Sequence, residues 1–440
     1  MTRFHCQRAW LGDAGFADNV IIEVQDGRIS TVGVGPPGDA IRMRGLVVPG
    51  FANAHSHAFH RVLRGRSQSG QGTFWTWREH MYAAAERLSP QRYAALARAV
   101  YAEMVQAGYT SVGEFHYLHH GPGGVAFDDP NEMGAALIQA ALAAGLRITL
   151  LDACYLHGGI DQPLNSVQRR FSDGTVDRWI ERADQRHLLR SETVRLGVAV
   201  HSVRAVLPSE IARVAEYAAD RGLVVHAHVS EQVAENQQCL AAYGRTPTEV
   251  LADSGVLTGR FSAVHATHLS STDVDALGRH QCTVCCCPTT ERDLADGCAP
   301  TGRLVFAGVR LSIGSDSQAV IDPMDEMRAI EMNARLDTMT RGSHHAADLL
   351  RAATSDGHAS IGWPDLGSIR VGDLADLVSL DLGSVRLSGL DDLPAEAIAF
   401  AATASDVDQV VVGGTLVVDR GRHLSIDVVG ELRQAIAALL

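Results

Sequence analysis

The sequence contains no lysine, so all 38 residues counted as lysine plus arginine are arginine. Without a lysine amine the chain has no Schiff-base nucleophile, no phosphate-loop lysine and no carbamylated lysine to bridge two metal ions. A compositional bias of the genome explains the absence. Whatever the cause of the missing lysine, enzymes that need a catalytic or metal-bridging lysine are excluded.

Signals of membrane insertion, secretion and nucleic-acid binding are missing too. No apolar run is long enough to span a bilayer, and the first residues lack a basic region followed by an apolar run, so we expect a cytoplasmic protein with no membrane partner. The formal net charge of −13 without clustered arginines argues against a nucleic-acid partner. The eight cysteines, three of them adjacent at positions 285–287, do not resemble a disulfide framework.

What is present fits a compact enzyme: 440 residues, 46% hydrophobic, with 42 glycines. Both ends carry short β-rich runs, and Gln25-Asp26-Gly27 separates two of them as a hairpin turn would. We expect residues 1–46 and 365–440 to pair into one small β-sandwich domain with a C-terminal helix. Residues 47–364 then form the catalytic domain.

In that central part, apolar runs alternate with helical patterns such as Pro90 to Ala107 and Pro208 to Arg221. Eight such units predict an α/β fold of the TIM type, a (β/α)8 barrel with its reactive groups at the carboxyl ends of the strands. The expected strands are Leu46 to Phe51, Thr110 to Phe115, Arg147 to Leu151, Arg195 to Val200, Leu223 to His226, Ser262 to Val264, Thr283 to Cys286 and Arg310 to Ile313.

Histidines and carboxylates follow four of these strands. His55 and His57 are spaced by one residue, so on extended chain their side chains point to the same face. A second such pair, His226 and His228, is followed by Glu231, and two later strands run into His265 and Asp316. One His-x-His pair is weak support for a metal, but four strand ends delivering ligands at the active-site end of a barrel predict a metal site.

On these residues the chain resembles the amidohydrolase superfamily, and within it the mononuclear deaminases. The resemblance implies that His55, His57 and His228 bind the metal through neutral nitrogens, that Asp316 completes the site, and that His226 is a packed neighbour. Three nitrogens and one oxygen suit a single Zn²⁺ per chain, which activates water near neutral pH, with iron or manganese as the alternative metals. The missing lysine agrees, because binuclear members commonly use a carbamylated lysine.

Longer strings resemble one family, the formimidoylglutamate deiminases of histidine degradation, which convert N-formimidoyl-L-glutamate to N-formyl-L-glutamate and ammonia by hydrolytic deimination. The strings are His55-Ser56-His57-Ala58-Phe59, Phe74-Trp75-Thr76-Trp77-Arg78, Glu114-Phe115-His116-Tyr117, His201-Ser202-Val203-Arg204-Ala205-Val206 and Cys287-Pro288-Thr289-Thr290-Glu291.

This family resemblance also assigns substrate contacts. It implies that the glutamate part is held by Arg78, Tyr117, His201 and Arg204, and that Glu231 faces the formimidoyl nitrogen. Two alternatives stay open: Arg78 as an arginine on a surface helix beside exposed tryptophans, and Tyr117 as a core tyrosine with a satisfied hydroxyl.

Several histidines and cysteines lie outside the predicted ligand set. Members of the family often carry glutamine where this chain has His60, so we expect His60 to contact substrate through one hydrogen bond. We expect His116, His119 and His120 to be loop histidines. Cys282-x-x-Cys285 has zinc-ribbon spacing, but no second such pair follows, and burial in a strand is the better interpretation.

The expected reaction is attack of metal-activated water on the formimidoyl carbon, with Glu231, His265 and Asp316 as catalytic groups. Rival functions are deamination of a guanine-like ring, ring opening by an imidazolonepropionase, and a non-catalytic barrel that serves as a scaffold. Arg78 and Arg204 disfavour the ring deaminase, because such an enzyme needs a flat apolar pocket and two arginines would make the pocket charged. For partners we expect a small-molecule substrate and a second copy of the chain in a homodimer.

Overall fold

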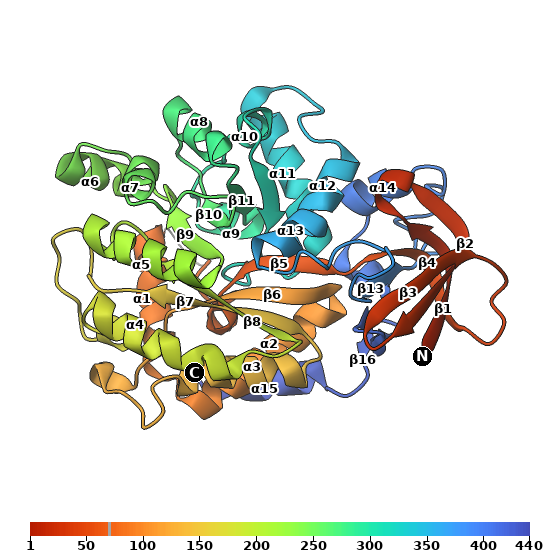
Figure 1. Ribbon diagram of the computed structural model, residues 1–440, viewed down its shortest axis with the longest axis horizontal. Coiled ribbons are helices and arrows are strands. Elements are labelled where there is room, and N and C mark those ends of the chain that lie inside the picture. The colour runs from red at the N-terminus through yellow and green to blue at the C-terminus, as the bar shows by residue number, and fades with distance from the viewer. Residues whose placement is uncertain (69–71) are drawn as a thin grey trace.

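The computed structural model describes residues 1–68 and 72–440, and their strands form two eight-stranded sheets. Figure 1 separates the sheets into a larger body with the C-terminus and a smaller β unit with the N-terminus. The β unit contains β1 (Thr2–Trp10), β2 (Phe16–Gln25), β3 (Arg28–Val34), β4 (Ile41–Pro49), β13 (Leu377–Leu380), β14 (Val407–Val412), β15 (Thr415–Asp419) and β16 (Arg422–His423). The body contains β5 (Phe51–Ser56), β6 (Tyr109–His116), β7 (Arg147–Cys154), β8 (Val194–Val200), β9 (Val225–Val229), β10 (Phe261–His265), β11 (Thr283–Cys286) and β12 (Arg310–Ile313).

The body is the expected TIM-type barrel. Its strands pair in parallel in chain order from β5 to β12. The seam between β12 and β5 is bridged where the amide of Asp316 donates to the carbonyl of His55 and the amide of His57 donates to the carbonyl of Asp316, each over 3.0 Å. A Cβ at Gly314 would lie 2.8 Å from that of His55, so only glycine permits this approach. The seam therefore joins two segments that carry predicted metal ligands.

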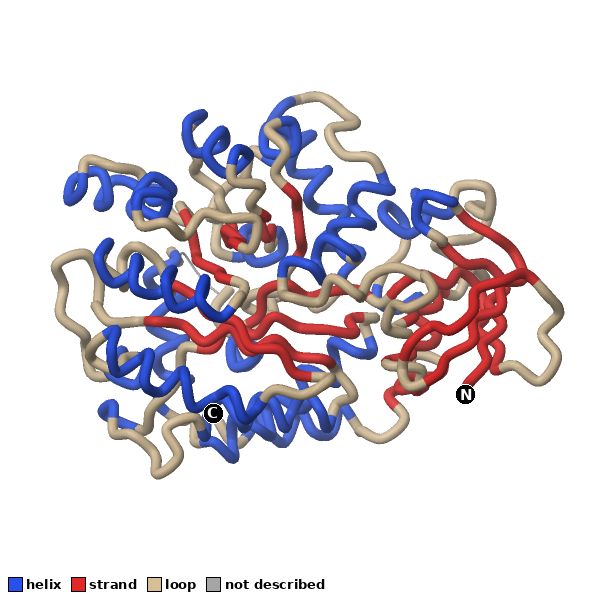
Figure 2. The backbone as a smooth tube through the Cα atoms, viewed as in Figure 1, coloured by secondary structure: helices blue, strands red, loops and turns tan. Residues whose placement is uncertain are grey.

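Helices cover the outside of the barrel, in blue around the red strands of Figure 2. Local signals set their ends: the Ser89 hydroxyl accepts from the amide of Arg92 at the start of α2, and Gly222 ends α5 in the left-handed conformation with φ 62°. The helices are α1 (Phe74–Glu86), α2 (Pro90–Gln106), α3 (Glu132–Ala143), α4 (Val176–Gln185), α5 (Pro208–Arg221), α6 (Val233–Tyr243), α7 (Pro247–Asp253), α8 (Ser271–Arg279), α9 (Pro288–Asp293), α10 (Thr301–Phe306), α11 (Pro323–Thr338), α12 (Ala346–Ala353), α13 (Ser355–Ser360), α14 (Pro394–Glu396) and α15 (Val428–Ala437).

Both termini build the β unit, as the sequence predicts. Its strands follow the order β16-β15-β14-β13-β4-β1-β2-β3 in one mixed sheet, and the antiparallel pairing of β4 with β13 joins the two chain ends. The predicted hairpin joins β2 to β3, with φ of 51° at Asp26 and 76° at Gly27. The unit has its own apolar core, which includes Phe4, Ile22 and Leu377.

Two details differ from expectation. The run Leu46 to Phe51 does not form the first barrel strand: most of it belongs to β4, and the barrel begins with β5 at Phe51. An unbroken apolar run passes from one buried sheet into the next, so hydrophobicity alone does not mark the boundary. The C-terminal helix α15 packs against barrel helix α2, where Arg98 pairs with Glu431 over 3.2 Å.

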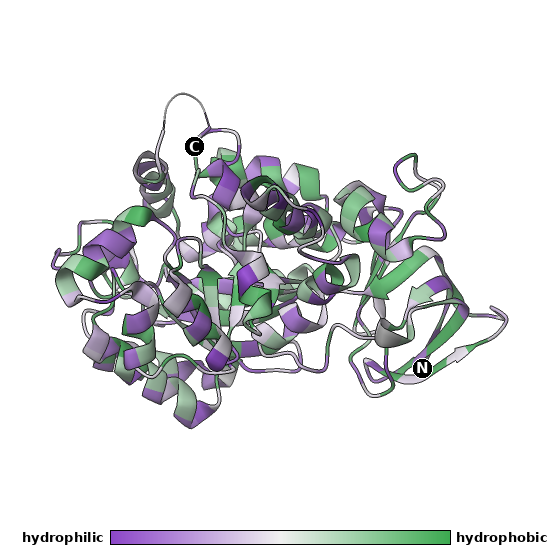
Figure 3. Ribbon diagram, turned by 90° about the horizontal axis from the view of Figure 1, so that it is seen from above, coloured by the Kyte–Doolittle hydropathy of each residue, from purple (hydrophilic) through white to green (hydrophobic). Residues whose placement is uncertain are grey.

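The barrel strands are buried, with every residue of β5, β6 and β7 inside the fold, and green hydrophobic ribbon lies at the centre of the molecule in Figure 3. Cys285 and Cys287 lie in a small core with Ile361 and Trp363, which follow α13 and close the amino end of the barrel. Cys282 belongs to the larger outer core, so it does not share a site with Cys285. All eight cysteines are free thiols, as expected.

Within the described residues no helix has both the length and the apolar character that crossing a bilayer requires.

Candidate active site

Four of the predicted residues meet at the carboxyl end of the barrel. His55 lies in β5, His57 directly after it, His228 in β9, and Asp316 three residues beyond β12. The Oδ1 atom of Asp316 is 3.4 Å from Nε2 of His55 and 3.5 Å from Nε2 of His57. The Nε2 atoms of His57 and His228 are 3.3 Å apart. Three imidazoles and a carboxylate thus converge on one point.

The chemistry of these groups fits a metal ion. Nδ1 of His57 donates to the carbonyl of Phe115 over 2.9 Å, and Nδ1 of His228 donates to that of His201 over 2.8 Å. These bonds leave both Nε2 atoms unprotonated and 3.3 Å apart, which is the tautomer that a metal ligand requires. His55 is completely buried and neither of its ring nitrogens has a hydrogen-bond partner among the described residues. An orphaned buried imidazole of this kind is satisfied when it coordinates a cation.

Protonation favours the same role. Burial lowers the pKa of His55, His57 and His228, so their rings stay neutral. Burial alone would raise the pKa of Asp316, but the contact with His55 and the nearby histidines hold it below its usual value. The cluster therefore offers neutral nitrogens and an ionised carboxylate.

His265 and Glu231 flank this cluster. Nε2 of His265 lies 3.8 Å from Oε1 of Glu231 and 3.7 Å from Oδ2 of Asp316. Burial alone would lower the pKa of His265, but its hydrogen bond to Glu291 and the three carboxylates around it raise that pKa well above the usual value. His265 is thus a cation between carboxylates, next to the point where the ligands converge.

The backbone is strained where these side chains are presented. Ser230, His265 and Asp316 have φ values of 51°, 67° and 41°, in the left-handed region that non-glycine residues rarely adopt. Each follows or ends a barrel strand. Such a conformation costs on the order of 1–3 kcal/mol and clusters at functional sites, where it directs a side chain.

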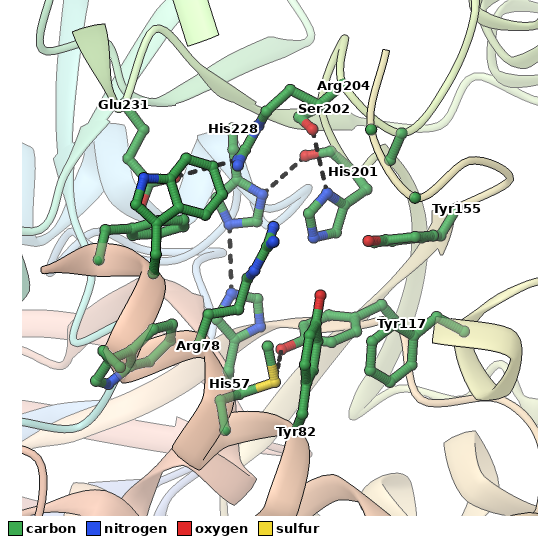
Figure 4. A pocket seen from close by; sticks show the side chains of 18 of the residues that line it. His57, Arg78, Tyr82, Tyr117, Tyr155, His201, Ser202, Arg204, His228 and Glu231 are labelled. Atoms are coloured by element: carbon green, nitrogen blue, oxygen red, sulfur yellow. Dashed lines mark hydrogen bonds and ion pairs between the residues drawn. The ribbon is translucent and has the colours of Figure 1, made fainter. Parts of the chain in front are cut away.

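A cavity of about 380 Å³ opens onto the cluster. Figure 4 shows Arg78 extending from α1 toward the centre, with His201, Tyr82 and Tyr155 pointing into the same space. All the predicted site residues except the deeply buried His55 line this cavity. Its further lining includes Phe74, Trp75, Trp77, Met81, Gln162, Phe171 and Gln238.

Two arginines make the cavity positive on one side. Arg78 stacks over Trp75, with its guanidinium carbon 4.5 Å from the ring centroid, and no salt bridge to it is found within residues 1–68 and 72–440. Arg204 is nearly buried, and its Nη2 lies 3.4 Å from Oε2 of Glu231. Burial lowers the pKa of His201 well below its usual value, and the charges of both arginines lower it further. Arg78 is therefore part of the cavity wall and not only a surface arginine.

His60 and Tyr117 form a pair on another wall. Nε2 of His60 is 2.8 Å from the Tyr117 hydroxyl, and burial lowers the pKa of His60 to about 3, so the ring is neutral. Tyr117 is buried, yet it lines the cavity and does not lie only in the core. A neutral histidine in this place offers a hydrogen bond but no charge.

The other histidines near the site have structural partners. His226 is buried and bonds to the carbonyl of Ser360 over 2.9 Å, as its expected packing role requires. His116 ends strand β6 and is not in a loop; His119 and His120 follow it, and all three are buried.

His116 and His119 form a second cluster with Asp152 that has metal-ligand spacing. Asp152 is already saturated, because Arg182 donates to both of its oxygens over 2.7 and 2.9 Å. Two buried arginines, Arg182 and Arg186, contact the same carboxylate and would repel a cation. This cluster is therefore part of the packing.

The structure adds residues that sequence reasoning missed. Glu291 contacts His265, Glu235 lies 3.8 Å from Nε of Arg204, and Tyr82 and Tyr155 line the cavity. Glu291 is the last residue of the string at positions 287–291, whose resemblance to the deiminase family was the signal in the sequence that could have identified it. Glu235 follows Glu231 by one helical turn, a spacing that indicates a shared face.

Residues 46–417 match the model of the amidohydrolase family. The chain belongs to this family. Amidohydrolases are metal-dependent hydrolases, and the chain is a hydrolase that acts on a C–N bond. It is 37% identical to the formimidoylglutamate deiminase of Pseudomonas aeruginosa, over 96% of each chain. It is 30% identical to a 5-methylthioadenosine/S-adenosylhomocysteine deaminase of Natronomonas pharaonis, over 95% of this chain and 92% of the other.

Solved amidohydrolase structures share the fold. The crystal structure of an amidohydrolase from Brucella melitensis superposes with a TM-score of 0.93 at 34% identity, over the whole of both chains. An adenosine deaminase from Xanthomonas campestris, solved with bound zinc, gives a TM-score of 0.86 at 23% identity, over 100% of this chain and 98% of the other. At that identity the second likeness shows the fold alone.

Proposed function

We propose that this protein hydrolyses N-formimidoyl-L-glutamate to N-formyl-L-glutamate and ammonia, a step of histidine degradation. The observation that carries the proposal is the charge distribution of the cavity: Arg78 and Arg204 line it, and Glu231 lies between Arg204 and His265. The substrate has two carboxylates and a formimidoyl group that is cationic near neutral pH, so it needs arginines at one end and a carboxylate at the other. The identity with the Pseudomonas aeruginosa deiminase supports the same substrate.

For the cofactor we infer one zinc ion per chain, held by His55, His57, His228 and Asp316. Three imidazole nitrogens and one carboxylate oxygen suit zinc. Zinc supplies a Lewis acid that makes water nucleophilic near neutral pH. The orphaned nitrogens of His55 support a ligand at this point.

Glu231 takes a proton from the attacking water and delivers it to the departing nitrogen. A C–O bond forms at the formimidoyl carbon while its double bond to the terminal nitrogen becomes single. The proton left on the adduct's oxygen then passes to Asp316 as the remaining bond to that nitrogen breaks, and ammonia takes up this proton as it leaves as ammonium. Asp316 and His265 orient the water, and the cationic His265 stabilises negative charge on the oxygen.

The remaining cavity residues position the substrate. Arg78 and Arg204 bind its carboxylates, while Tyr117, His201 and His60 donate or accept hydrogen bonds around the glutamate part. Holding the formimidoyl carbon next to Glu231 converts a bimolecular encounter into a step within one complex.

The test is ammonia release together with substrate consumption by the purified, metal-analysed protein on a panel of substrates, because opening of an imidazolone ring consumes the substrate without releasing ammonia. N-formimidoyl-L-glutamate is compared with guanine, 5'-methylthioadenosine and imidazolone propionate. We expect ammonia and N-formyl-L-glutamate from the first compound, at a kcat/KM at least about 10²-fold above the others, because a site built for charged groups rejects analogues that lack them. Preferred turnover of a ring compound, or no turnover with stoichiometric zinc, would overturn the proposal.

We further propose a homodimer located in the cytoplasm, as the sequence predicts. Sedimentation of the purified chain at several concentrations tests the first statement. A single species at the mass of one chain contradicts it. Fractionation of the source cells tests the second.

A further inference from the structure

Three carboxylates surround His265, and the proposed function uses only two of them. Glu231 and Asp316 face Nε2, on the cavity side. Glu291 faces Nδ1, on the opposite side of the ring, with its Oε1 atom 3.3 Å away. The side chains of His265 and Glu291 are 1% and 3% exposed, so water does not compete for this contact.

Glu291 is itself fixed by its own segment. The same Oε1 atom accepts from the amide of Cys287 over 2.8 Å, and the amide of Glu291 donates to the carbonyl of Cys287 over 2.9 Å. The carboxylate therefore cannot follow the imidazole if the imidazole rotates. Its position is set by the first turn of α9, which begins directly after Cys287.

The rest of this turn holds the opposite side of the site. The Thr290 hydroxyl accepts from the amide of Ser317 over 3.2 Å, next to Asp316. The Thr289 amide donates to Glu326 of α11 over 3.1 Å. One short segment thus joins His265, Asp316 and a buried helix, although none of its own side chains lines the cavity.

We propose that Glu291 is a positioning residue that fixes the ring of His265 so that Nε2 faces the space between Glu231 and Asp316. A fixed acceptor at Nδ1 selects one orientation of the ring and keeps the Nδ1 proton in place. His265 needs this second contact because its backbone is strained, with φ 67°, and Nε2 has no hydrogen-bond partner among the described residues. The proposal rests on the proposed function, in which His265 acts on the reacting oxygen.

The experiment compares Glu291→Ala and Glu291→Gln on N-formimidoyl-L-glutamate. Alanine removes the acceptor, so we expect kcat to fall by about 10 to 10²-fold, typical for a group that orients a catalytic residue, with KM within about threefold of the parent. Glutamine keeps an acceptor oxygen and nearly the same shape, and should restore most of this loss. Zinc content and melting temperature are measured for both variants.

A double-mutant cycle separates positioning from general disturbance. In a His265→Asn background, Glu291→Ala should cost less than about threefold, because the group it positions is gone. Glu326→Gln is the matched control: Glu326 is equally buried and bonds to the same turn but does not contact His265. We expect its kcat within about threefold of the parent.

Several results would overturn the inference: an unchanged kcat in Glu291→Ala, an equal cost in both backgrounds, or an equal loss in the Glu326 control. A loss in Glu291→Gln as large as in Glu291→Ala has the same effect. A parent protein that releases no ammonia from the substrate rejects the proposed function instead. The two failures are therefore distinguishable.

Discussion

Arg204 and Glu231 pair across the cavity, with Nη2 and Oε2 3.4 Å apart. Both side chains are nearly buried, and both belong to the proposed site. On the proposed function, we expect a substrate carboxylate that binds Arg204 to take the place of Glu231 beside the guanidinium and to leave Glu231 to serve proton transfer. In the free protein, the carboxylate of Glu231 neutralises the charge of Arg204.

Arg204→Gln is expected to raise KM on N-formimidoyl-L-glutamate by roughly 30-fold or more, since losing one partner of a buried charge pair costs about 2 kcal/mol or more. The surface arginine Arg213, 48% exposed and paired with Asp177, is the control, and Arg213→Gln should leave KM unchanged. Steady-state kinetics decide. Equal KM values for parent and Arg204→Gln would remove Arg204 from the substrate site.

His228→Ala is expected to lose the metal, because three remaining ligands bind zinc far less tightly. His226→Gln is the matched control, since His226 lies two residues away and bonds only to the carbonyl of Ser360 among the described residues. Metal analysis after dialysis should find zinc in the control alone. Stoichiometric zinc in His228→Ala would contradict the ligand assignment.

Glu231→Gln is expected to keep the metal and the fold but to lose about 10²-fold to 10⁴-fold in kcat, because an amide cannot carry a proton between water and nitrogen. KM should change far less, since glutamine bonds to Arg204 only weakly and leaves that arginine available to the substrate. A kcat within a few-fold of the parent shows that another group transfers the proton.

His60→Gln is expected to retain turnover, unchanged or improved. The His60 ring is neutral and shares one hydrogen bond with Tyr117, which a glutamine amide can replace. One such bond contributes roughly 0.5 to 1.5 kcal/mol, or about 2-fold to 13-fold. The kcat/KM of His60→Gln and His60→Ala is measured on the same substrate. A fall on the order of 10²-fold in both would make His60 part of the chemistry.

Glu235 predicts a pH dependence of stability. Burial raises its pKa from 4.5 to about 7, so the folded chain holds this proton more tightly than the unfolded chain. Its contribution to the free energy of unfolding is complete below pH 4.5 and is lost as the pH rises through about 7. Relative to the parent, Glu235→Gln should gain up to about 3 kcal/mol between pH 4.5 and 8. Urea unfolding of both proteins across this range checks it; a constant difference would show that Glu235 does not titrate.

Strand ends are the most predictable part of the site. A polar residue directly after a buried run is visible in the sequence, and the parallel strands of a barrel place all such residues at one end. This is why the sequence alone groups His55, His57, His228, His265 and Asp316. Their roles, and those of the substrate contacts, stay predictions.

Contacts that depend on tertiary packing are not predictable in this way. Glu291 lies 26 positions from His265, in the short helix α9, and no periodicity of the sequence links the two residues. The sequence pattern places the first barrel strand too early, because β4 and β5 are both buried and differ only in the sheet they join. It also places His116 in a loop, whereas strand β6 continues to this residue through the polar Glu114.

The seam between β5 and β12 joins segments that are synthesised far apart in time. Next to it, the side chains of Asn53 and Ser315 share a hydrogen bond although 262 positions separate them. Translation therefore delivers His55, His57 and His228 before Asp316, so a nascent chain that ends before β12 carries three of the four proposed ligands. On the proposed ligand set, we expect metal loading to follow closure of the seam, and a chain truncated before β12 to bind the ion far less tightly than the full chain.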